Sequence, residues 1–352
     1  MSKFVVIALA GISLGMSCGA LADDAPPTPQ EVVGYAQSLA QSATSGDKHA
    51  MATLRSNAGM KDAGAEFGLG EYYVLTKDYT QSIPWFQQAA DQSCSCGYYA
   101  LGVAYDLGQG VPQDYAKAMA LYLKAADELP EAKMRIGLLY AHGHGVKQDY
   151  AQAANWYRKA ADAGSSEADI ALGDAYQAGV GVEQDDTAAM HRYQIAADAG
   201  DAEAQYKLGL LYEHSKSIQD YKQSAAWYQK ASQQGVAYAQ LNLGLLYASG
   251  KGVPVDPGKA LQQFQMAANQ GDGQAQYHLA ESFADGKGTP VDPFRAYEWM
   301  TLAEASLDAI DPTSSVVAGR LKDLEGKLSP AQLARARQAA ADWLKSHGQV
   351  ER

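Results

Sequence analysis

The chain has 352 residues, of which 47% are hydrophobic and 19% charged, and its formal net charge is −12 at pH 7. The length exceeds one ordinary compact core, so several domains or a repeat array are expected, and the hydrophobic share excludes a chain that is disordered throughout. The acidic balance argues against nucleic acid and anionic membranes as partners. By the same electrostatic logic it favours a protein partner with a basic surface.

Residues 1–22 have the composition of an export signal. Lys3 is the one charged residue among them, an apolar run follows it, and residues 20–22 form the A-x-A pattern of a cleavage site. We expect cleavage after Ala22 and export to the periplasm of a bacterium. Loss of Lys3 would then change the net charge from −12 to −13. The apolar run is too short to predict a stable membrane span.

Two other patterns fall in the same segment. Cys18 could carry a lipid anchor, an alternative to the soluble form, although Gly15, Met16 and Ser17 before it fit a lipobox poorly. Residues 11–15 match the G-x-S-x-G pattern of a serine nucleophile, which needs a strand, a turn and a helix around it. An apolar export segment does not offer that context. No other stretch has a catalytic pattern, so we predict no catalytic residue and no enzyme activity.

Residues 23–64 precede the regular part of the chain. Residues 23–30 contain three prolines, and we expect a disordered lead-in there. Residues 31–45 and 48–58 are expected to form helices. We interpret this pair as a degenerate N-terminal cap.

Residues 132–166 show the unit from which the rest is built, two short helices joined by a glycine-rich loop. In the second half, apolar residues recur on one helical face: Ala153, Trp156, Tyr157, Ala160 and Ala161. Asp149 is placed to cap the start of this helix, and Gln152 completes a capping-box pattern. Gly164 is expected to end it.

The first half of the unit contains a glycine at an unexpected place. Ile136, Leu139 and Tyr140 share one helical face, and Gly137 lies between them. A glycine inside a helix costs about 1 kcal/mol relative to alanine. We therefore expect a neighbouring helix to approach closely at Gly137, and we expect positive φ angles at the loop glycines, such as Gly143.

This glycine recurs at steps of 32 to 36 residues along the chain. A fixed period in this range predicts a helical solenoid. The successive positions are Gly70, Gly102, Gly137, Gly173, Gly209 and Gly244, followed by Ala280. Two further helices, over 314–326 and 330–346, are expected to close the array within a C-terminal capping region, residues 307–352.

The recurring letters resemble a known family. The order LG-x-LY, G-x-GV, DY-x-x-A, WY-x-KAA and a closing glycine is similar to the Sel1-like repeats, relatives of the tetratricopeptide repeats. Seven copies cover residues 65–306. The resemblance implies an all-α, right-handed superhelical solenoid of helix-loop-helix repeats, with a helical cap at each end and the first helices lining its concave face.

Cysteine and histidine offer no metal site. After cleavage the chain keeps Cys94 and Cys96, whose spacing leaves open a local disulfide, two free thiols or a redox or metal pair. A Cys-x-Cys pair alone does not supply the four ligands of a zinc site. His142 and His144 occupy variable loop positions with no third ligand near them in sequence. We predict no metal and no cofactor.

Two rows of variable positions in the first helices are candidate partner contacts. The row directly before the conserved leucine or isoleucine, called the specificity row below, is Gly68, Ala100, Arg135, Ala171, Lys207, Asn242 and His278. The second row lies three positions before the same leucine or isoleucine and consists of Glu66, Tyr98, Lys133, Asp169, Gln205, Gln240 and Gln276. Arginine and tyrosine are favoured as interface anchors, and polar groups can specify a partner. The leading candidates are therefore Tyr98, Arg135, Lys207, Asn242 and His278.

These features predict a periplasmic, non-enzymatic protein-binding solenoid that is a monomer when unbound. The resemblance includes immunity proteins that neutralise antibacterial phospholipase toxins delivered by type VI secretion, and the acidic surface suits such a basic-mouthed partner. Alternatives are an envelope adaptor or scaffold in polysaccharide export or signalling, and a penicillin-binding or hydrolysing protein. Relatives of the last kind carry a cysteine pair in repeat after repeat, whereas this chain has one pair, Cys94 and Cys96, and no S-x-x-K element with its partners.

Overall fold

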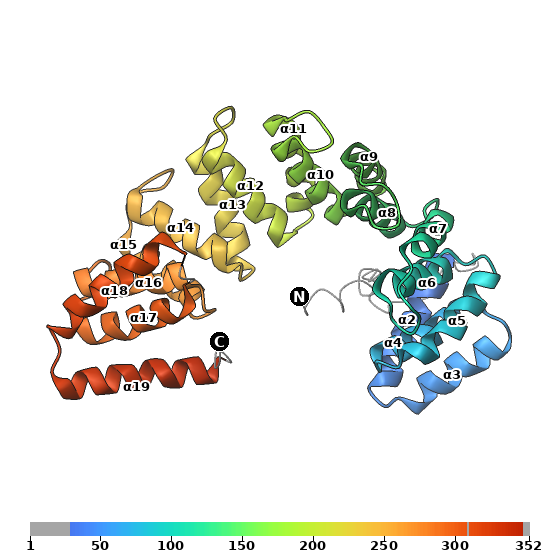
Figure 1. Ribbon diagram of the computed structural model, residues 1–352, viewed down its shortest axis with the longest axis horizontal. Coiled ribbons are helices and arrows are strands. Elements are labelled where there is room, and N and C mark those ends of the chain that lie inside the picture. Colours follow the sequence, from blue (N-terminus) through green and yellow to red (C-terminus); the bar gives the residue numbers. More distant parts are fainter. Residues whose placement is uncertain (1–28, 308–309, 348–352) are drawn as a thin grey trace, which may run out of the picture. The chain divides into compact units, whose positions relative to one another are not determined.

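The computed structural model describes residues 29–307 and 310–347, which form eighteen helices and no strand. The predicted export segment, with Cys18, Ala22 and the G-x-S-x-G pattern, lies outside the described residues. The chain divides into two compact units between Gln184 and Asp185. Figure 1 shows the helices of each unit stacked in chain order. None of the described helices combines the length and the apolar character that a membrane crossing needs.

The first unit contains helices α2 to α10. From α4 to α9 the helices form hairpins, and the second helix of each hairpin also packs against the first helix of the next repeat. The helices are α2 (Pro29–Thr44), α3 (Lys48–Gly59), α4 (Ala63–Leu75), α5 (Tyr79–Asp91), α6 (Ser95–Leu107), α7 (Tyr115–Ala125), α8 (Pro130–His142), α9 (Tyr150–Ala161) and α10 (Ser166–Ala178).

The second unit contains helices α11 to α19. The hairpin pattern continues to α17, and α18 and α19 both pack against α17. The helices are α11 (Asp186–Asp198), α12 (Ala202–His214), α13 (Tyr221–Gln233), α14 (Ala237–Ser249), α15 (Pro257–Ala268), α16 (Gly273–Asp285), α17 (Pro293–Ser306), α18 (Pro312–Glu325) and α19 (Pro330–Ser346).

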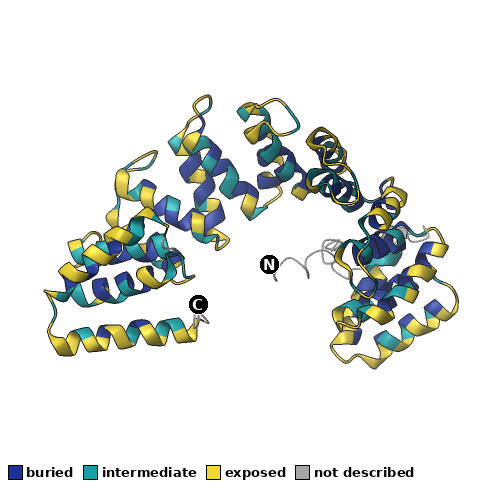
Figure 2. Cartoon of the chain, in the orientation of Figure 1, coloured by how far each residue is buried: buried dark blue, intermediate teal, exposed yellow. Residues whose placement is uncertain are grey.

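The end helices have the one-sided burial of caps. In α3 the buried side chains are confined to one face, at Ala50, Leu54 and Ala58. In α19 only Ala336 and Ala340 are buried, and Figure 2 shows the rest of both helices largely exposed. Such a polar outer face is what keeps the end of a repeat array from pairing with another array.

The caps and loop glycines follow the predicted chemistry, with one correction. Asp149 accepts a hydrogen bond from the Gln152 N–H at 3.0 Å, as predicted. The capping box with the Gln152 side chain is wrong, because the Asp149 N–H donates instead to the Tyr140 carbonyl at 3.0 Å and closes the loop. Gly143 and Gly164 have φ angles of 71° and 92°, as expected for glycines that end helices.

The glycines inside the first helices leave room for an aromatic ring. A Cβ atom built on Gly137 would lie 2.5 Å from Cε1 of Tyr157, which belongs to the second helix of the same repeat. The predicted close approach is therefore confirmed. The same glycine and ring meet in four other described pairs: Gly70 with Phe86, Gly102 with Tyr122, Gly209 with Tyr228, and Gly244 with Phe264.

Candidate functional site

The row three positions before the conserved leucine is mostly buried, and the prediction of partner contacts for it is wrong at five positions. The exposed fractions are 3% for Glu66, 2% for Asp169, 6% for Gln205, 2% for Gln240 and 0% for Gln276. The three glutamine amides donate to carbonyls at the end of the preceding second helix: Gln205 to Ala197 at 3.1 Å, Gln240 to Ser232 at 3.2 Å, and Gln276 to Ala268 at 3.3 Å. These side chains join one repeat to the next.

Tyr98 is the candidate of that row whose side chain reaches the surface. It is half-buried on α6, where the ammonium group of Lys124 lies 5.0 Å from its ring centroid. A cation at that distance from a tyrosine ring is within the range of a cation–π contact. One face of the half-buried Tyr98 ring is therefore already in contact with Lys124 of the same chain.

Arg135, in the specificity row, is engaged within the first unit. Its guanidinium donates a hydrogen bond to the Tyr99 hydroxyl, and the Tyr122 hydroxyl donates to the Asp106 carboxylate at 3.0 Å. Burial raises the pKa of Tyr122 well above its usual value, the Asp106 charge raises it further, and Arg135 opposes both. Arg135 thus compensates the charge of Asp106 in a half-buried aromatic setting.

Asn242 occupies the corresponding place in the second unit. Its amide donates to the Tyr228 hydroxyl at 3.2 Å, and that hydroxyl donates to the Glu213 carboxylate at 2.8 Å. Asn242 also hydrogen-bonds to Tyr206. Lys207, one repeat earlier in the same row, lies 3.6 Å from Glu203 in an ion pair.

His278 lines a cavity of about 310 Å³ between the sixth and seventh repeats. Its imidazole stacks on Phe264 with ring centroids 5.1 Å apart. Burial, together with the charge of Lys287, lowers the pKa of His278 to about 4, so the imidazole is neutral at pH 7. Leu245 and Pro257 contribute apolar wall to the same cavity.

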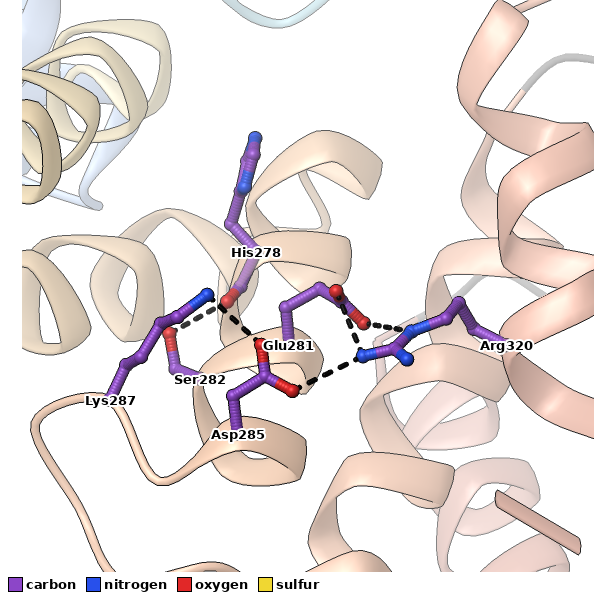
Figure 3. A network of polar contacts seen from close by, with 6 residues as sticks. All are labelled: His278, Glu281, Ser282, Asp285, Lys287 and Arg320. Carbon is purple, nitrogen blue, oxygen red and sulfur yellow. Dashed lines mark hydrogen bonds and ion pairs between the residues drawn. The ribbon is translucent and has the colours of Figure 1, made fainter. Parts of the chain in front are cut away.

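The carboxylates beside this cavity are paired with cations (Figure 3). Arg320 of α18 binds Glu281 with two hydrogen bonds of 2.7 and 3.0 Å and reaches Asp285 at 3.3 Å. Lys287 holds the other oxygen of Asp285 at 2.9 Å. The imidazole of His278 points away from this network. The cavity therefore offers apolar walls, a neutral imidazole and a rim whose charges are internally balanced.

The same neighbourhood does not form a catalytic pair. Ser282 lies one turn after His278, but its hydroxyl donates to the His278 backbone carbonyl at 2.8 Å and not to the imidazole. A serine nucleophile needs a base within hydrogen-bond distance of its hydroxyl. The geometry suits binding of an apolar side chain, with one polar contact to the imidazole.

The repeats of both units match a known family along most of the chain. Seven segments match the Sel1 repeat: residues 60–94, 97–128, 130–165, 166–201, 202–236, 237–272 and 273–305. The chain belongs to the Sel1 repeat family. It is therefore an all-α solenoid of repeats that serve protein–protein interaction, and the resemblance read from the sequence is confirmed.

Several solved structures and curated proteins are similar to this chain. A Sel1 repeat protein from Oxalobacter formigenes is 27% identical, with a TM-score of 0.58, over 70% of this chain and 99% of that one. An immunity protein from Pseudomonas aeruginosa is 21% identical over 66% of this chain and 82% of that one, and its TM-score of 0.34 supports no functional argument. DAP3-binding cell death enhancer 1 from Rattus norvegicus is 39% identical over 51 residues, 14% of this chain and 10% of the relative's length.

The remaining candidates of the Sel1 repeat protein are a cysteine pair and a histidine pair. Cys94 and Cys96 are joined by a disulfide at the start of α6, with their Cα atoms 5.3 Å apart. His142 and His144 stack on each other at 5.4 Å. Within the described residues, no three His, Cys, Asp or Glu side chains are grouped to hold a metal ion.

Sequence reasoning missed the rings and carboxylates that surround the specificity row. Tyr206 lies two positions before its conserved leucine and Glu213 five positions after it. Phe264 lies in a second helix and was assigned to no site. A repeat period identifies equivalent positions, but the contacts between these residues depend on how successive hairpins pack.

Proposed function

We propose that this Sel1 repeat protein is a periplasmic, non-enzymatic binding protein whose partner presents a basic surface. The observation that carries the proposal is the set of half-buried polar side chains at one equivalent position of four first helices, Arg135, Lys207, Asn242 and His278, on a chain of net charge −12. The most specific form of the proposal is an immunity protein that covers and neutralises a secreted antibacterial phospholipase-type toxin. An enzyme that acts on anionic lipid needs a basic mouth, which an acidic solenoid complements.

The cysteine pair supports the proposed address. Disulfides persist in oxidising compartments such as the bacterial periplasm and are rare in reducing ones. The Cys94–Cys96 bond agrees with export directed by residues 1–22. The proposal of a periplasmic location rests on these two features together.

The cavity beside His278 supplies an anchor point for such a partner. Its volume of about 310 Å³ fits one large side chain, and its walls include Leu245 and Phe264. Interfaces derive most of their binding energy from a few apolar or aromatic anchors in such pockets. The acidic surface would steer the basic partner, and the cavity would hold it.

The experiment uses the mature chain, residues 23–352, and a secreted lipase encoded beside its gene. We expect binding, inhibition of lipase turnover, and weakening of both as salt concentration rises. Leu245→Lys, at the cavity wall, should weaken binding at least tenfold. Gln223→Lys makes the same charge change on an exposed position of α13 and should have little effect.

Two outcomes would separate the levels of the proposal. Absence of both binding and inhibition rules out the immunity function for that lipase. Equal weakening by Leu245→Lys and Gln223→Lys would show that charge alone, and not the cavity, determines binding. Turnover of nitrocefin by the purified chain would contradict the non-enzymatic assignment.

A further inference from the structure

Two equivalent sites, one in each unit, differ in whether the next repeat supplies a cation. Tyr99 and Tyr206 both lie two positions before the conserved leucine, and Asp106 and Glu213 both lie five positions after it. Each carboxylate accepts a hydrogen bond from the second-helix tyrosine that packs on the repeat glycine. The next repeat contributes Arg135 to the first site and Asn242 to the second.

In the first unit the arginine completes the site. The guanidinium of Arg135 lies near both Tyr99 and Tyr122 and compensates the charge of Asp106. Arginine suits this environment because its planar group stacks on aromatic faces and pairs with carboxylates. The cation Arg135 and the anion Asp106 are thus both supplied by the same chain, and Glu131 and Glu167 also act on Tyr99.

In the second unit the cation is missing and Tyr206 is more exposed than its counterpart Tyr99. Asn242 is neutral and shorter, so it satisfies the hydroxyls of Tyr206 and Tyr228 without compensating Glu213. The one ion-pair partner of Glu213 in the described part of the chain is the imidazole of His214, at 4.0 Å, which is charged only when protonated. The Glu213 side chain keeps 18% of its surface exposed.

A further ring extends this second site to the surface. Tyr238, from the first turn of α14, is 62% exposed, and its ring centroid lies 6.1 Å from that of Tyr206. Tyr206 in turn lies 6.0 Å from Tyr228. Burial raises the pKa of Tyr206, and the charges of Tyr238, Asp272 and Glu213 raise it further, so two carboxylates act on this tyrosine.

We propose that the surface formed by Tyr206, Tyr238, Asn242 and Glu213 binds an arginine side chain of the partner protein. The guanidinium would stack on the exposed Tyr238 ring and pair with the Glu213 carboxylate, and so supply the positive charge that Arg135 supplies beside Tyr99, Tyr122 and Asp106 in the first unit. This rests on the proposed function, because it names the group on the basic partner that one site recognises. Lysine would bind more weakly, since it lacks the planar group that stacks and pairs at once.

The test titrates the full mature chain with blocked arginine, Nα-acetyl-arginine amide, and follows the tyrosine ring signals by NMR with 13C-labelled tyrosine. We expect saturable shifts of the Tyr206 and Tyr238 signals, assigned with Tyr206→Phe and Tyr238→Phe. The neutral analogue with citrulline should bind at least about tenfold more weakly, because it keeps the shape and loses the charge.

Two variants test the mechanism without emptying the site. Glu213→Gln keeps an acceptor for the Tyr228 hydroxyl and should weaken arginine binding about tenfold. Asn242→Arg should fill the site from within, as Arg135 does, and abolish the shifts while circular dichroism remains unchanged. Equal binding of arginine and citrulline, or shifts that persist unaltered in Asn242→Arg, would overturn the proposal.

The same variants distinguish this inference from the proposed function. If a basic partner binds wild type, Glu213→Gln and Asn242→Arg equally, the chain is still a binding protein and the arginine site is wrong. If no basic partner binds but blocked arginine does, the site stands and the proposed function is wrong.

Discussion

The ring of Tyr157 lies against the α-carbon of Gly137, so closely that a Cβ atom at Gly137 would stand 2.5 Å from ring atom Cε1. The second-helix ring is completely or nearly completely buried in the same pair elsewhere, as for Tyr122 and Tyr228. The cost of glycine in a helix is thus offset by the burial of an aromatic side chain that any larger residue would displace. The last repeat shows the alternative, with Ala280 in the glycine position and the flexible Met300 in the ring position.

Gly137→Ala should therefore destabilise the first unit, although alanine favours helix. We expect a loss of about 1–3 kcal/mol, the usual cost of forcing an extra methyl group into a packed core. Urea unfolding, monitored by hydrogen exchange in α8 and α9, would measure this loss of stability. Gly34→Ala is the matched control, because no atom lies within 4 Å of a Cβ built there, and it should be neutral or stabilising.

The double variant Gly137→Ala/Tyr157→Met should recover part of that loss. It copies the Ala280 and Met300 pair of the last repeat, where methionine adapts to the alanine methyl group. The recovery is measured relative to each single variant in a double-mutant cycle. If the double variant is only as stable as the sum of the singles predicts, the packing explanation for the glycine is wrong.

The sequence predicted the elements whose chemistry is local to one hairpin. The aspartate caps, the loop glycines and the need for space at Gly137 all follow from residues within about 20 positions of one another. The buried glutamines could not be identified in this way. Gln240 and Gln276 are polar and variable, which resembles a surface position, and only the packing of the next repeat shows that their amides bind carbonyls of the preceding helix.

The surface formed by Tyr206, Tyr238, Asn242 and Glu213 could not be predicted from the sequence for a related reason. Asn242 was identified as a candidate by its row, but its ring partners come from two different helices of the repeat before it. Neither Tyr206 nor Tyr228 belongs to the two rows of variable positions from which candidates are predicted. Their hydroxyl groups face Asn242 only because successive hairpins stack with one register, which a period alone does not determine.

Gln240→Leu should destabilise the second unit by about 1–3 kcal/mol, because it removes the buried hydrogen bond to the Ser232 carbonyl and the oxygen that accepts from the Gln270 amide. Gln262→Leu, at an exposed position of α15, makes the same chemical change and should alter stability by less than about 0.5 kcal/mol. Thermal or urea unfolding of the second unit measures both. Equal effects would contradict the role of Gln240 in joining repeats.

Glu71 should make the first unit less stable as pH rises. Burial raises its pKa to about 7, from 4.5, and the hydrogen bond with Gln37 only partly opposes this shift. The folded state then binds more protons than the unfolded state between about pH 4.5 and 7, so stability falls by about 3 kcal/mol across that window. Glu71→Gln should remove the decrease. If the free energy of unfolding changes with pH equally in wild type and variant from pH 5 to 8, the prediction is wrong.

His278 should give the second unit the opposite pH dependence. Its pKa is lowered from 6.5 to about 4, mainly by burial, so the unfolded state binds more protons between these values. The contribution of His278 to stability is fully present above about pH 6.5, and stability falls by about 3 kcal/mol as pH drops to about 4. In His278→Gln that decrease should disappear. Hydrogen exchange in α16 at pH 5 and pH 7 would compare the two proteins.

The most direct test of the account is capture of a partner from periplasmic and secreted fractions by the mature chain, residues 23–352, alongside Leu245→Lys and Gln223→Lys. One basic protein should co-purify with wild type and Gln223→Lys, its recovery should fall at least tenfold with Leu245→Lys, and its binding should weaken as salt concentration rises. Equal recovery by all three proteins, or a partner that is acidic and insensitive to salt, would contradict it.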